Sequence, residues 1–346
     1  MTAATRDPDA VPSLRVDYSD QPLPVLLAAD DTLLVIGFGS DAPRCDDPRY
    51  LHVALEPFGD SPFEVWHAGA PVTSGRDGVG DEAVAWSVDG ALQFGAMELD
   101  EIPPAGLDAG RDIETAAAAI YTRMAAFNRA RGYPHLLRVW NYFDGITSGD
   151  DDAERYRRFC SGRARGIGDA DPTTLPAATA IGMTGGGREN APRRLQVYWL
   201  AARAQGTPVE NPRQLSAYRY PRQYGPQPPS FARAMLPASA AIPLLLSGTA
   251  AVVGHESRHA DCVAAQLDET LRNFDSLLDA ARARRPQLSP EFGPHTRLKV
   301  YVRDQDDLAQ VAALLRTRLG ASVPCVVLHA AICRRELRLE IDGVHG

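Results

Sequence analysis

The expected helices and strands of this chain occur in the same order twice. In each series an apolar strand comes first, followed by an amphipathic helix, a strand, a shorter helix and two more strands. Apolar residues at intervals of three and four indicate the helices, and short apolar or alternating runs indicate the strands. The first series covers residues 91–96, 112–128, 135–140, 153–165, 177–182 and 194–201, and the second covers 244–253, 263–278, 297–303, 308–319, 325–332 and 337–344.

This repeat predicts an α+β fold made of two copies of one unit. Each unit is expected to be a mixed or antiparallel sheet covered by two helices, because the apolar side of a helix must be buried against a sheet. The pattern breaks near residues 203–212. We therefore expect an N-terminal domain at residues 1–205 and a C-terminal domain at residues 206–346, which carries most of the active site. Pockets are common at the boundary between two domains, so we expect the site to lie close to this boundary.

One segment of the chain contains basic but no acidic side chains. From Asn211 to His255 forty-five residues pass without an Asp or Glu, although the chain has 44 acidic and 36 basic residues. Guanidinium groups bind carboxylates or phosphates through paired hydrogen bonds, and phenols add neutral donors. The segment is therefore a candidate site for an anionic ligand, with a solvated surface loop as the alternative. Its relevant side chains are Arg213, Arg219, Arg222, Arg233, Tyr218, Tyr220, Tyr224 and Phe231.

Composition and charge argue against several classes of partner. The net charge of −8 and the pI near 5.5 disfavour nucleic acid and anionic membranes. No apolar run reaches the ~18 residues that a membrane helix requires, and the first residues lack the pattern of a signal peptide. The five cysteines are scattered without CxxC spacing, so we expect reduced thiols in the cytoplasm.

Three motifs suggest ligand sites but have simpler interpretations. Residues His255 to His259 fit the HExxH spacing of zinc peptidases, yet they follow a glycine at a strand-to-helix junction and no third ligand follows. We expect no metal there, and interpret them as polar residues that cap the helix after Cys262 or line a pocket rim. The triplet Gly185 to Gly187 is interpreted as a hairpin connection. The acidic run at residues 149–154 is interpreted as charge that stabilises the start of a helix.

Glu340 lies in the last expected strand, where side chains alternate between two faces. Leu337, Leu339 and Ile341 are expected to point inward, and Glu340 and its neighbours Arg338 and Asp342 to the opposite face. Periodicity alone predicts a solvated carboxylate. If another element covers that face, burial would raise the pKa of Glu340 and make it a candidate proton donor. A duplicated fold could supply this cover from the other copy.

Blocks of sequence in the order of a known family occur along much of the chain. They are Val139–Asn141, Tyr156–Ala164, Pro176–Gly182, Glu210–Gln214, Tyr218–Pro221, Tyr224–Pro226, Phe231–Ala234 and Ser247–Thr249. In these blocks the chain resembles the chorismatases, the family of 3-hydroxybenzoate synthases and chorismate-cleaving enzymes. Leu246–Thr249, Lys299–Val302 and Leu339–Gly343 resemble the YjgF/Rid family of small α+β proteins, so the resemblance implies two YjgF/Rid-like units.

The resemblance implies a small-molecule substrate, chorismate, and no cofactor. Chorismate carries a ring carboxylate and an enolpyruvyl carboxylate. By similarity, Tyr156 and Arg163 hold one carboxylate and Tyr220 and Arg233 the other, with Arg213 as a nearby supporter. Which pair holds which carboxylate stays open. Two fused copies are expected to build the site internally, which implies a monomer or a weak homo-oligomer.

The resemblance also implies roles in catalysis. Glu340 matches the family's acid, which protonates the methylene carbon of the enolpyruvyl ether. Gly248 and Cys333 match the members that aromatise the ring, which implies 3-hydroxybenzoate and pyruvate as products and leaves 4-hydroxybenzoate open as a second product. The alternatives are a hydrolase that yields a dihydroxycyclohexadiene carboxylate, a Rid-type imine deaminase or ligand-binding module, and a zinc peptidase.

Overall fold

Helices and β-sheets form layers in the described part of the chain. The computed structural model describes residues 11–102, 112–169, 171–184 and 193–346. Within these ranges the strands form one four-stranded sheet, two six-stranded sheets and a short hairpin. No helix there has the length and apolarity required to cross a membrane. Short 3-10 turns occur at Gly80–Glu82, Asp151–Ala153, Pro172–Thr174, Ala217–Arg219, Arg222–Tyr224 and Gln305–Asp307.

The first six-stranded sheet and its two helices form one unit. In chain order the unit contains β5 (Thr73–Asp77), β6 (Val84–Val88), β7 (Leu92–Asp100), α2 (Ile113–Arg131), β8 (His135–Asp144), α3 (Arg155–Ile167), β9 (Ala177–Met183) and β10 (Arg194–Ala202). The strands lie in the order β5-β6-β7-β10-β8-β9. All neighbours are antiparallel except β8 and β9, which are parallel because α3 carries the chain back between them.

The second six-stranded sheet repeats this arrangement. Its unit contains β11 (Thr207–Val209), β12 (Ala234–Leu236), β13 (Leu244–Thr249), the hairpin β14 (Val252–Val253) and β15 (Glu256–Ser257), α4 (Val263–Arg282), β16 (Arg297–Val302), α5 (Leu308–Leu319), β17 (Cys325–His329) and β18 (Leu339–His345). The order β11-β12-β13-β18-β16-β17 again ends in a parallel pair. The prediction of two α+β units, each with two helices, is confirmed. The proposed division at residues 205 and 206 falls between the two sheets and stays a prediction.

Local sequence signals fix the ends of α2. Asp112 caps its first turn, because the carboxylate accepts a hydrogen bond from the Thr115 backbone N–H at 2.9 Å. Gly132 ends the helix with φ of 79°, a left-handed conformation that favours glycine. The apolar stripe of the helix, including Ile120 and Met124, is fully buried against its sheet. The helix therefore extends three residues beyond the expected end at Asn128, to Arg131.

The four-stranded sheet near the N-terminus was not predicted. It contains β1 (Leu14–Ser19), α1 (Leu23–Ala28), β2 (Thr32–Phe38), β3 (Tyr50–Val53) and β4 (Phe63–Ala68), in the strand order β1-β4-β2-β3. The sheet packs on both units. Trp66 makes an edge contact with Trp140 of the first unit, with ring centroids 5.5 Å apart. Tyr18 donates a hydrogen bond to the Leu298 carbonyl of the second unit at 2.8 Å.

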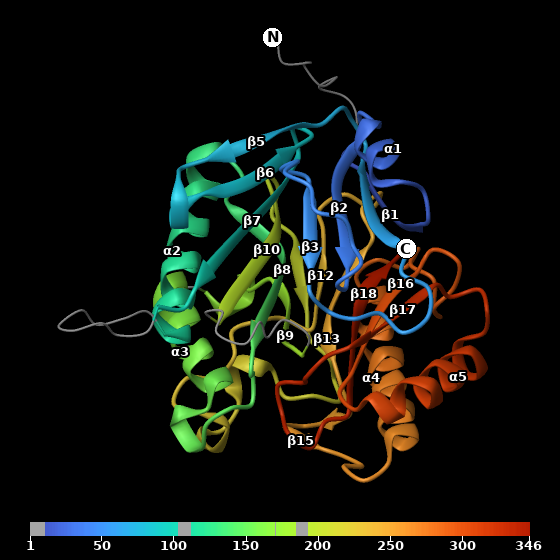
Figure 1. The fold of residues 1–346 in the computed structure, drawn as a ribbon. Coiled ribbons are helices and arrows are strands. Elements are labelled where there is room, and N and C mark those ends of the chain that lie inside the picture. The colour runs from blue at the N-terminus through green and yellow to red at the C-terminus, as the bar shows by residue number, and fades with distance from the viewer. Residues whose placement is uncertain (1–10, 103–111, 170, 185–192) are drawn as a thin grey trace, which may run out of the picture.

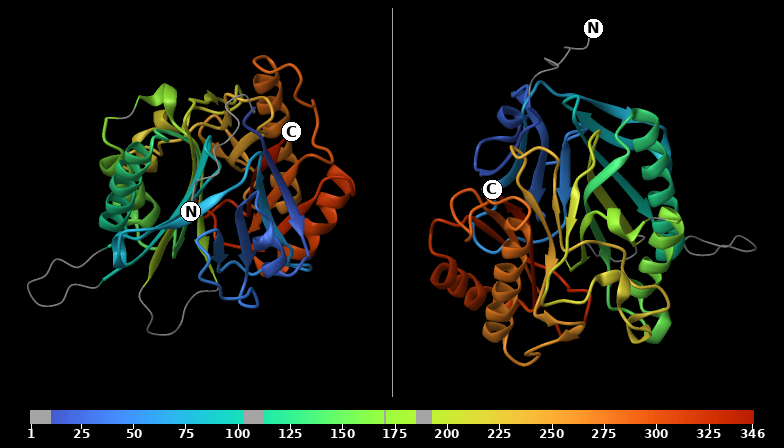
Figure 2. Two further views of the ribbon diagram at one scale, coloured as in Figure 1. Left: turned by 90° about the horizontal axis from the view of Figure 1, so that it is seen from above. Right: turned by 180° about the vertical axis from the view of Figure 1, so that it is seen from behind.

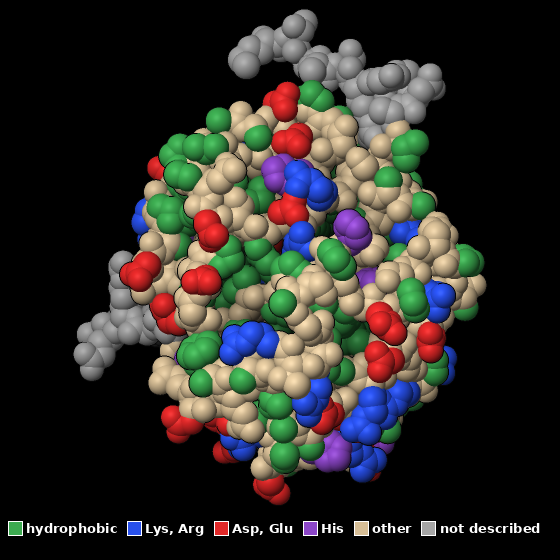
Figure 3. Space-filling model, turned by 90° about the vertical axis from the view of Figure 1, so that its right-hand side faces the viewer, with side chains coloured by type: hydrophobic (Ala, Val, Ile, Leu, Met, Phe, Trp, Pro, Cys, Tyr) green, Lys and Arg blue, Asp and Glu red, His purple; other side chains and the backbone are tan. Residues whose placement is uncertain are grey.

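The sheets lie between the two helix pairs, with α2 and α3 on one outer side and α4 and α5 on the other (Figures 1 and 2). Strand β9 lies at the seam of the units, where Gly182 and Ala331 exchange backbone hydrogen bonds of 2.8 and 2.9 Å. On the face drawn in Figure 3, acidic and basic side chains are interspersed, so the charge of −8 does not form one continuous acidic surface there.

Candidate active site

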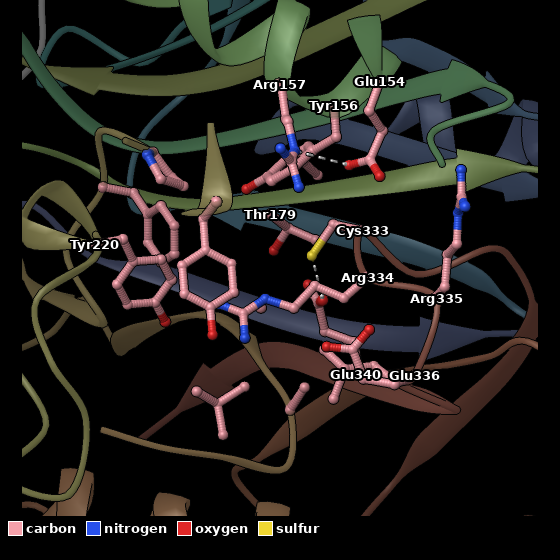
Figure 4. A pocket seen from close by; sticks show the side chains of 18 of the residues that line it. Glu154, Tyr156, Arg157, Thr179, Tyr220, Cys333, Arg334, Arg335, Glu336 and Glu340 are labelled. Atoms are coloured by element: carbon pink, nitrogen blue, oxygen red, sulfur yellow. Dashed lines mark hydrogen bonds and ion pairs between the residues drawn. The ribbon is translucent and has the colours of Figure 1, made fainter. Parts of the chain in front are cut away.

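A cavity of about 500 Å³ lies at the seam between the two units. Strand β9 lines it from the first unit, and β13 and β18 line it from the second. Helix α3, the segment before β12 and the loop between β17 and β18 also contribute to the wall (Figure 4). Seven of the eight predicted site residues line this cavity: Tyr156, Arg163, Tyr220, Arg233, Gly248, Cys333 and Glu340.

Glu340 points into the cavity from the face of β18 that the first unit covers. Leu339 and Ile341 pack into the core beneath α4, so Glu340 and Asp342 point to the opposite face. That face meets the first unit, and Glu340 is only 6% exposed and Asp342 fully buried. The prediction of a solvated carboxylate from periodicity alone is therefore wrong. The alternative, a carboxylate covered by the other copy of the unit, is correct.

The surroundings of Glu340 favour its protonated form. Burial raises the pKa of Glu340 to about 8, because the charged form loses its hydration, and the negative charge of Asp342 acts in the same direction. The guanidinium groups of Arg138, Arg233 and Arg334 oppose both effects. A carboxylic acid with this pKa still holds its proton at neutral pH and can donate it to a substrate.

Two buried guanidinium groups in the cavity have unused hydrogen-bond donors. Arg163 is 3% exposed, and its Nε and Nη2 atoms have no hydrogen-bond partner. Arg233 donates from Nη2 to the hydroxyl of Tyr220 and to the Leu215 carbonyl, both at 2.8 Å, while its Nε has no partner. Buried donors without partners are costly. Among the described residues these donors have no acceptor, so the two side chains are candidates to bind an anionic ligand.

Three further arginines, Arg157, Arg334 and Arg335, line the cavity and were missed in the sequence, and Arg334 has the most contacts with the predicted segment. The guanidinium group of Arg334 lies 5.1 Å from the ring centroid of Tyr220 (Figure 4). It lies 4.1 Å from the ring centroid of Tyr224. Nη1 donates hydrogen bonds to the His255 carbonyl at 2.8 Å and to Ser257 Oγ at 3.1 Å. Its position directly after Cys333, a predicted site residue, could have indicated that Arg334 belongs to the site.

Gly248 leaves space that the Glu340 carboxyl group occupies. A Cβ atom at Gly248 would lie 1.9 Å from Glu340 Oε1 and 3.3 Å from Thr179 Oγ1. The Cys333 Sγ atom lies 4.0 Å from Glu340 Oε2 (Figure 4), and burial raises the pKa of this thiol, so it is neutral. The absent methyl group at Gly248 therefore makes room for the acid itself as well as for a ligand.

Arg213 does not line the cavity. Its guanidinium group forms an ion pair with Glu269 and donates a hydrogen bond to Asn273 Oδ1 at 3.0 Å, both on α4. Arg222, from the same segment, pairs with Asp152 at 2.6 Å. Carboxylates from other parts of the chain thus neutralise two arginines of a segment that has no acidic residues of its own.

The HExxH pentapeptide lies mainly in the β14–β15 hairpin and not on a helix. The His255 ring contacts that of Tyr224, with centroids 5.6 Å apart, whereas His259 Nε2 lies 3.4 Å from Glu269 Oε2. Helix α4 begins after Cys262 without a side-chain cap, so the predicted capping role is wrong. The two histidines thus have different neighbours, and the helical geometry of a zinc peptidase is not present in this segment.

The acidic run does not occupy the first turn of a helix. Asp151 to Ala153 form a 3-10 turn, and α3 begins later, at Arg155, with no acidic residue in its first turn. Asp150 lies 3.3 Å from Arg335, and Asp152 pairs with Arg222. The run ends at Glu154, the residue just before α3, so its charge lies outside the first turn, and ion pairs hold two of its carboxylates. The interpretation as helix-stabilising charge stays a prediction. The Gly185 to Gly187 triplet lies outside the described residues.

A buried acid beside unpaired guanidinium groups defines an enzyme site for an anionic substrate. The family model described as Chorismatase FkbO/Hyg5-like, N-terminal, matches residues 64–201. A chorismatase of Streptomyces hygroscopicus is 39% identical over 288 residues, covering 81% of this chain and 78% of that protein. A 3-hydroxybenzoate synthase of the same species is 35% identical over 329 residues, covering 90% and 91%.

A solved structure extends this similarity to the whole fold. The crystal structure of a chorismatase superposes with a TM-score of 0.79 at 34% identity, covering 97% of this chain and 98% of that one. The chain belongs to the chorismatase family.

Proposed function

We propose that this enzyme converts chorismate to 3-hydroxybenzoate and pyruvate. The observation that carries the proposal is the buried Glu340 carboxyl group facing a cavity that also contains unpartnered guanidinium donors. The names of its relatives support it, because a 3-hydroxybenzoate synthase and two chorismatases align with most of the chain. A cavity of about 500 Å³ is adequate for a small dianionic ligand.

The two carboxylates of chorismate would bind to the two arginine and tyrosine pairs. Tyr156 and Arg163 belong to α3 of the first unit, while Tyr220 and Arg233 belong to the segment before β12 of the second unit. Each pair offers a phenol and a charged donor. The substrate would therefore bridge the seam. Because Arg213 is already paired on α4, its role would be to hold the segment in place rather than to contact the substrate.

The proposed reaction begins with proton transfer from Glu340 to the methylene carbon of the enolpyruvyl group. The methylene becomes a methyl group, the adjacent carbon becomes an oxocarbenium ion, and Glu340 becomes a carboxylate. Arg138, Arg233 and Arg334 then favour that carboxylate electrostatically. Water adds to the cationic carbon, the bond from that carbon to the ring ether oxygen breaks, and pyruvate leaves. Loss of a ring proton and the neighbouring ring hydroxyl as water then gives the aromatic ring and returns the water that was added. 3-Hydroxybenzoate and pyruvate together contain all the atoms of chorismate, so this route requires no net water.

The identity of the ring product is a more specific proposal than the cleavage of chorismate. Hydrolysis would add one water and yield a dihydroxycyclohexadiene carboxylate, whereas aromatisation yields 3-hydroxybenzoate, with 4-hydroxybenzoate open as a second product. Gly248 and Cys333 both lie beside Glu340, where they can influence how the cation collapses. We also propose that the enzyme is a monomer or a weak homo-oligomer, because one chain supplies all the cavity residues described here. We further propose that it is cytoplasmic.

The experiment that tests this function is incubation with chorismate in the presence of a chelator, followed by chromatography. We expect equal amounts of pyruvate and 3-hydroxybenzoate, with no requirement for metal. Predominant diol would support the hydrolase alternative. Absence of any pyruvate, together with turnover of an imine substrate, would instead support a Rid-type deaminase.

The activity is expected to fall at alkaline pH. Because the protonated form of Glu340 is the active one and its pKa is about 8, kcat/KM should be constant below this value and decrease tenfold per pH unit above it. Steady-state rates measured from neutral to alkaline pH in buffers of constant ionic strength would check this. Activity that rises through pH 8 would indicate a base in place of an acid.

A further inference from the structure

Asp342 lies beside Glu340 on the same face of β18 and has no access to solvent. Its Oδ2 atom accepts three hydrogen bonds: from Arg138 Nη2 at 2.9 Å, from Thr179 Oγ1 at 2.7 Å and from the Tyr301 hydroxyl at 3.1 Å. Thr179 also lines the cavity. Side chains of both units thus hold this buried carboxylate in place, on the same strand face as Glu340.

The cluster around Asp342 contains two cations and two anions. Lys299 Nζ lies 3.6 Å from Asp342 Oδ1 and donates hydrogen bonds to both carboxylate oxygens of Glu64, at 3.0 and 2.9 Å. Arg138 is the second cation. Lys299 is the single lysine among the 36 basic residues of the chain, and it is only 2% exposed. Its compact ammonium group fits a small space between two carboxylates.

We propose that Asp342 is a positioning residue of the proposed reaction, which keeps the Glu340 carboxyl group in its proton-donating form and holds the Thr179 hydroxyl beside the space at Gly248 that Glu340 occupies. Asp342 and Glu340 share one buried face of β18, so ionisation of Glu340 would place a second negative charge beside a carboxylate that has no access to solvent. The hydrogen bond to Asp342 also fixes Thr179, whose Oγ1 lies beside the Gly248 space that Glu340 occupies. This inference rests on the proposed function.

Other charged and titratable groups face Glu340 from the surrounding elements. The negative charge of Asp342 raises the pKa of Glu340, whereas three arginines lower it. Cys333 and Tyr156 lie close enough to be affected by Glu340, and both have raised pKa values, so they remain neutral. The groups that interact with Glu340 in this way are Asp342 on β18, Arg138 on β8, Tyr156 on α3, Arg233 before β12, and Cys333 and Arg334 in the loop before β18. Arg163 on α3 and Glu336 before β18 also line the cavity.

The test is the pH dependence of kcat/KM in Asp342→Asn, a change that keeps the shape and removes the charge. We expect the alkaline limb to move to lower pH by about one unit or more. Glu64→Gln is the matched control, because it removes an equal buried charge that is paired directly with Lys299, whereas the charge of Asp342 is the one that raises the pKa of Glu340. Its alkaline limb should stay in place. Equal shifts in both variants, or none in Asp342→Asn, would overturn the proposal.

Loss of Asp342 alone leaves two buried cations with one anion and can prevent folding. The double variant Asp342→Asn with Lys299→Met keeps the cluster balanced and should show the same shift. Direct titration of Glu340 by isotope-edited infrared spectroscopy, with Glu340→Gln as the blank, requires no substrate. A midpoint that is lower in the variants than in the parent supports the role of Asp342 even if chorismate is not turned over. An unchanged midpoint refutes it.

Discussion

Replacing Glu340 with glutamine is expected to abolish most turnover of chorismate while leaving the fold and substrate binding intact. Glutamine has nearly the same shape but no acidic proton, and protonation of carbon requires a strong donor. Loss of a general acid typically lowers kcat by ~10²–10⁴-fold. The arginine side chains that would hold the substrate carboxylates belong to other elements, so Kd should change little. Single-turnover kinetics and calorimetric binding measure these two quantities separately.

The matched control for this variant is Glu336→Gln. Glu336 also lines the cavity, but it is exposed and accepts a hydrogen bond from Ser257 at 2.7 Å. Its replacement should leave kcat within a few-fold of the parent. If Glu340→Gln also keeps turnover within a few-fold, another group supplies the proton and the assignment fails.

The buried acid also links activity to stability. The pKa of Glu340 rises from 4.5 in the unfolded chain to about 8 in the fold, so the folded state binds the proton more tightly. This contribution to stability is complete below pH 4.5 and is lost as the pH rises through 8. The glutamine variant lacks this dependence. A site that can protonate carbon is therefore maintained at a cost in stability at alkaline pH.

The duplicated fold could be predicted because its helices and most of its strands repeat a clear period. Helix α2 begins at a capping Asp112 and ends at Gly132, both of which are recognisable in the sequence. The N-terminal sheet could not be predicted in this way. Strand β2 (Thr32–Phe38) is buried at every position, so it has no alternation of polar and apolar residues, and its apolar run does not distinguish a buried strand from a buried helix.

The site was harder to predict, because charged side chains acquire their roles from distant partners. Glu340 looks like a surface residue in its strand, and only burial in the tertiary fold raises its pKa. Arg213 and Arg233 belong to one segment, yet Glu269 pairs with the first and not with the second. Arg334 lies outside that segment and was missed. The sequence reveals which residues can bind anions, but the partner of each depends on the tertiary fold.

The second large effect is expected from Gly248→Ala. The backbone at Gly248 does not have a positive φ, so alanine is compatible with its local conformation. The new methyl group would lie 1.9 Å from Glu340 Oε1 and 2.9 Å from its Cδ, far inside contact distance. Because Oε1 is the end of a flexible side chain, the variant should fold by displacing the carboxyl group.

This displacement should change both the rate and the products. A misplaced acid transfers its proton less efficiently, and the altered space beside the cation should favour hydrolysis over aromatisation. A difference of ~1.4 kcal/mol between competing barriers changes the product ratio tenfold, and a closely packed site has little room to adjust. We expect at least this shift from 3-hydroxybenzoate toward the dihydrodiol, measured by chromatography, with a smaller change in substrate affinity.

Cys333→Ala, which removes the thiol without a collision, is the comparison variant. If both variants keep the parental product ratio, Gly248 and Cys333 do not direct the reaction, and the choice between its products must depend on other residues of the cavity.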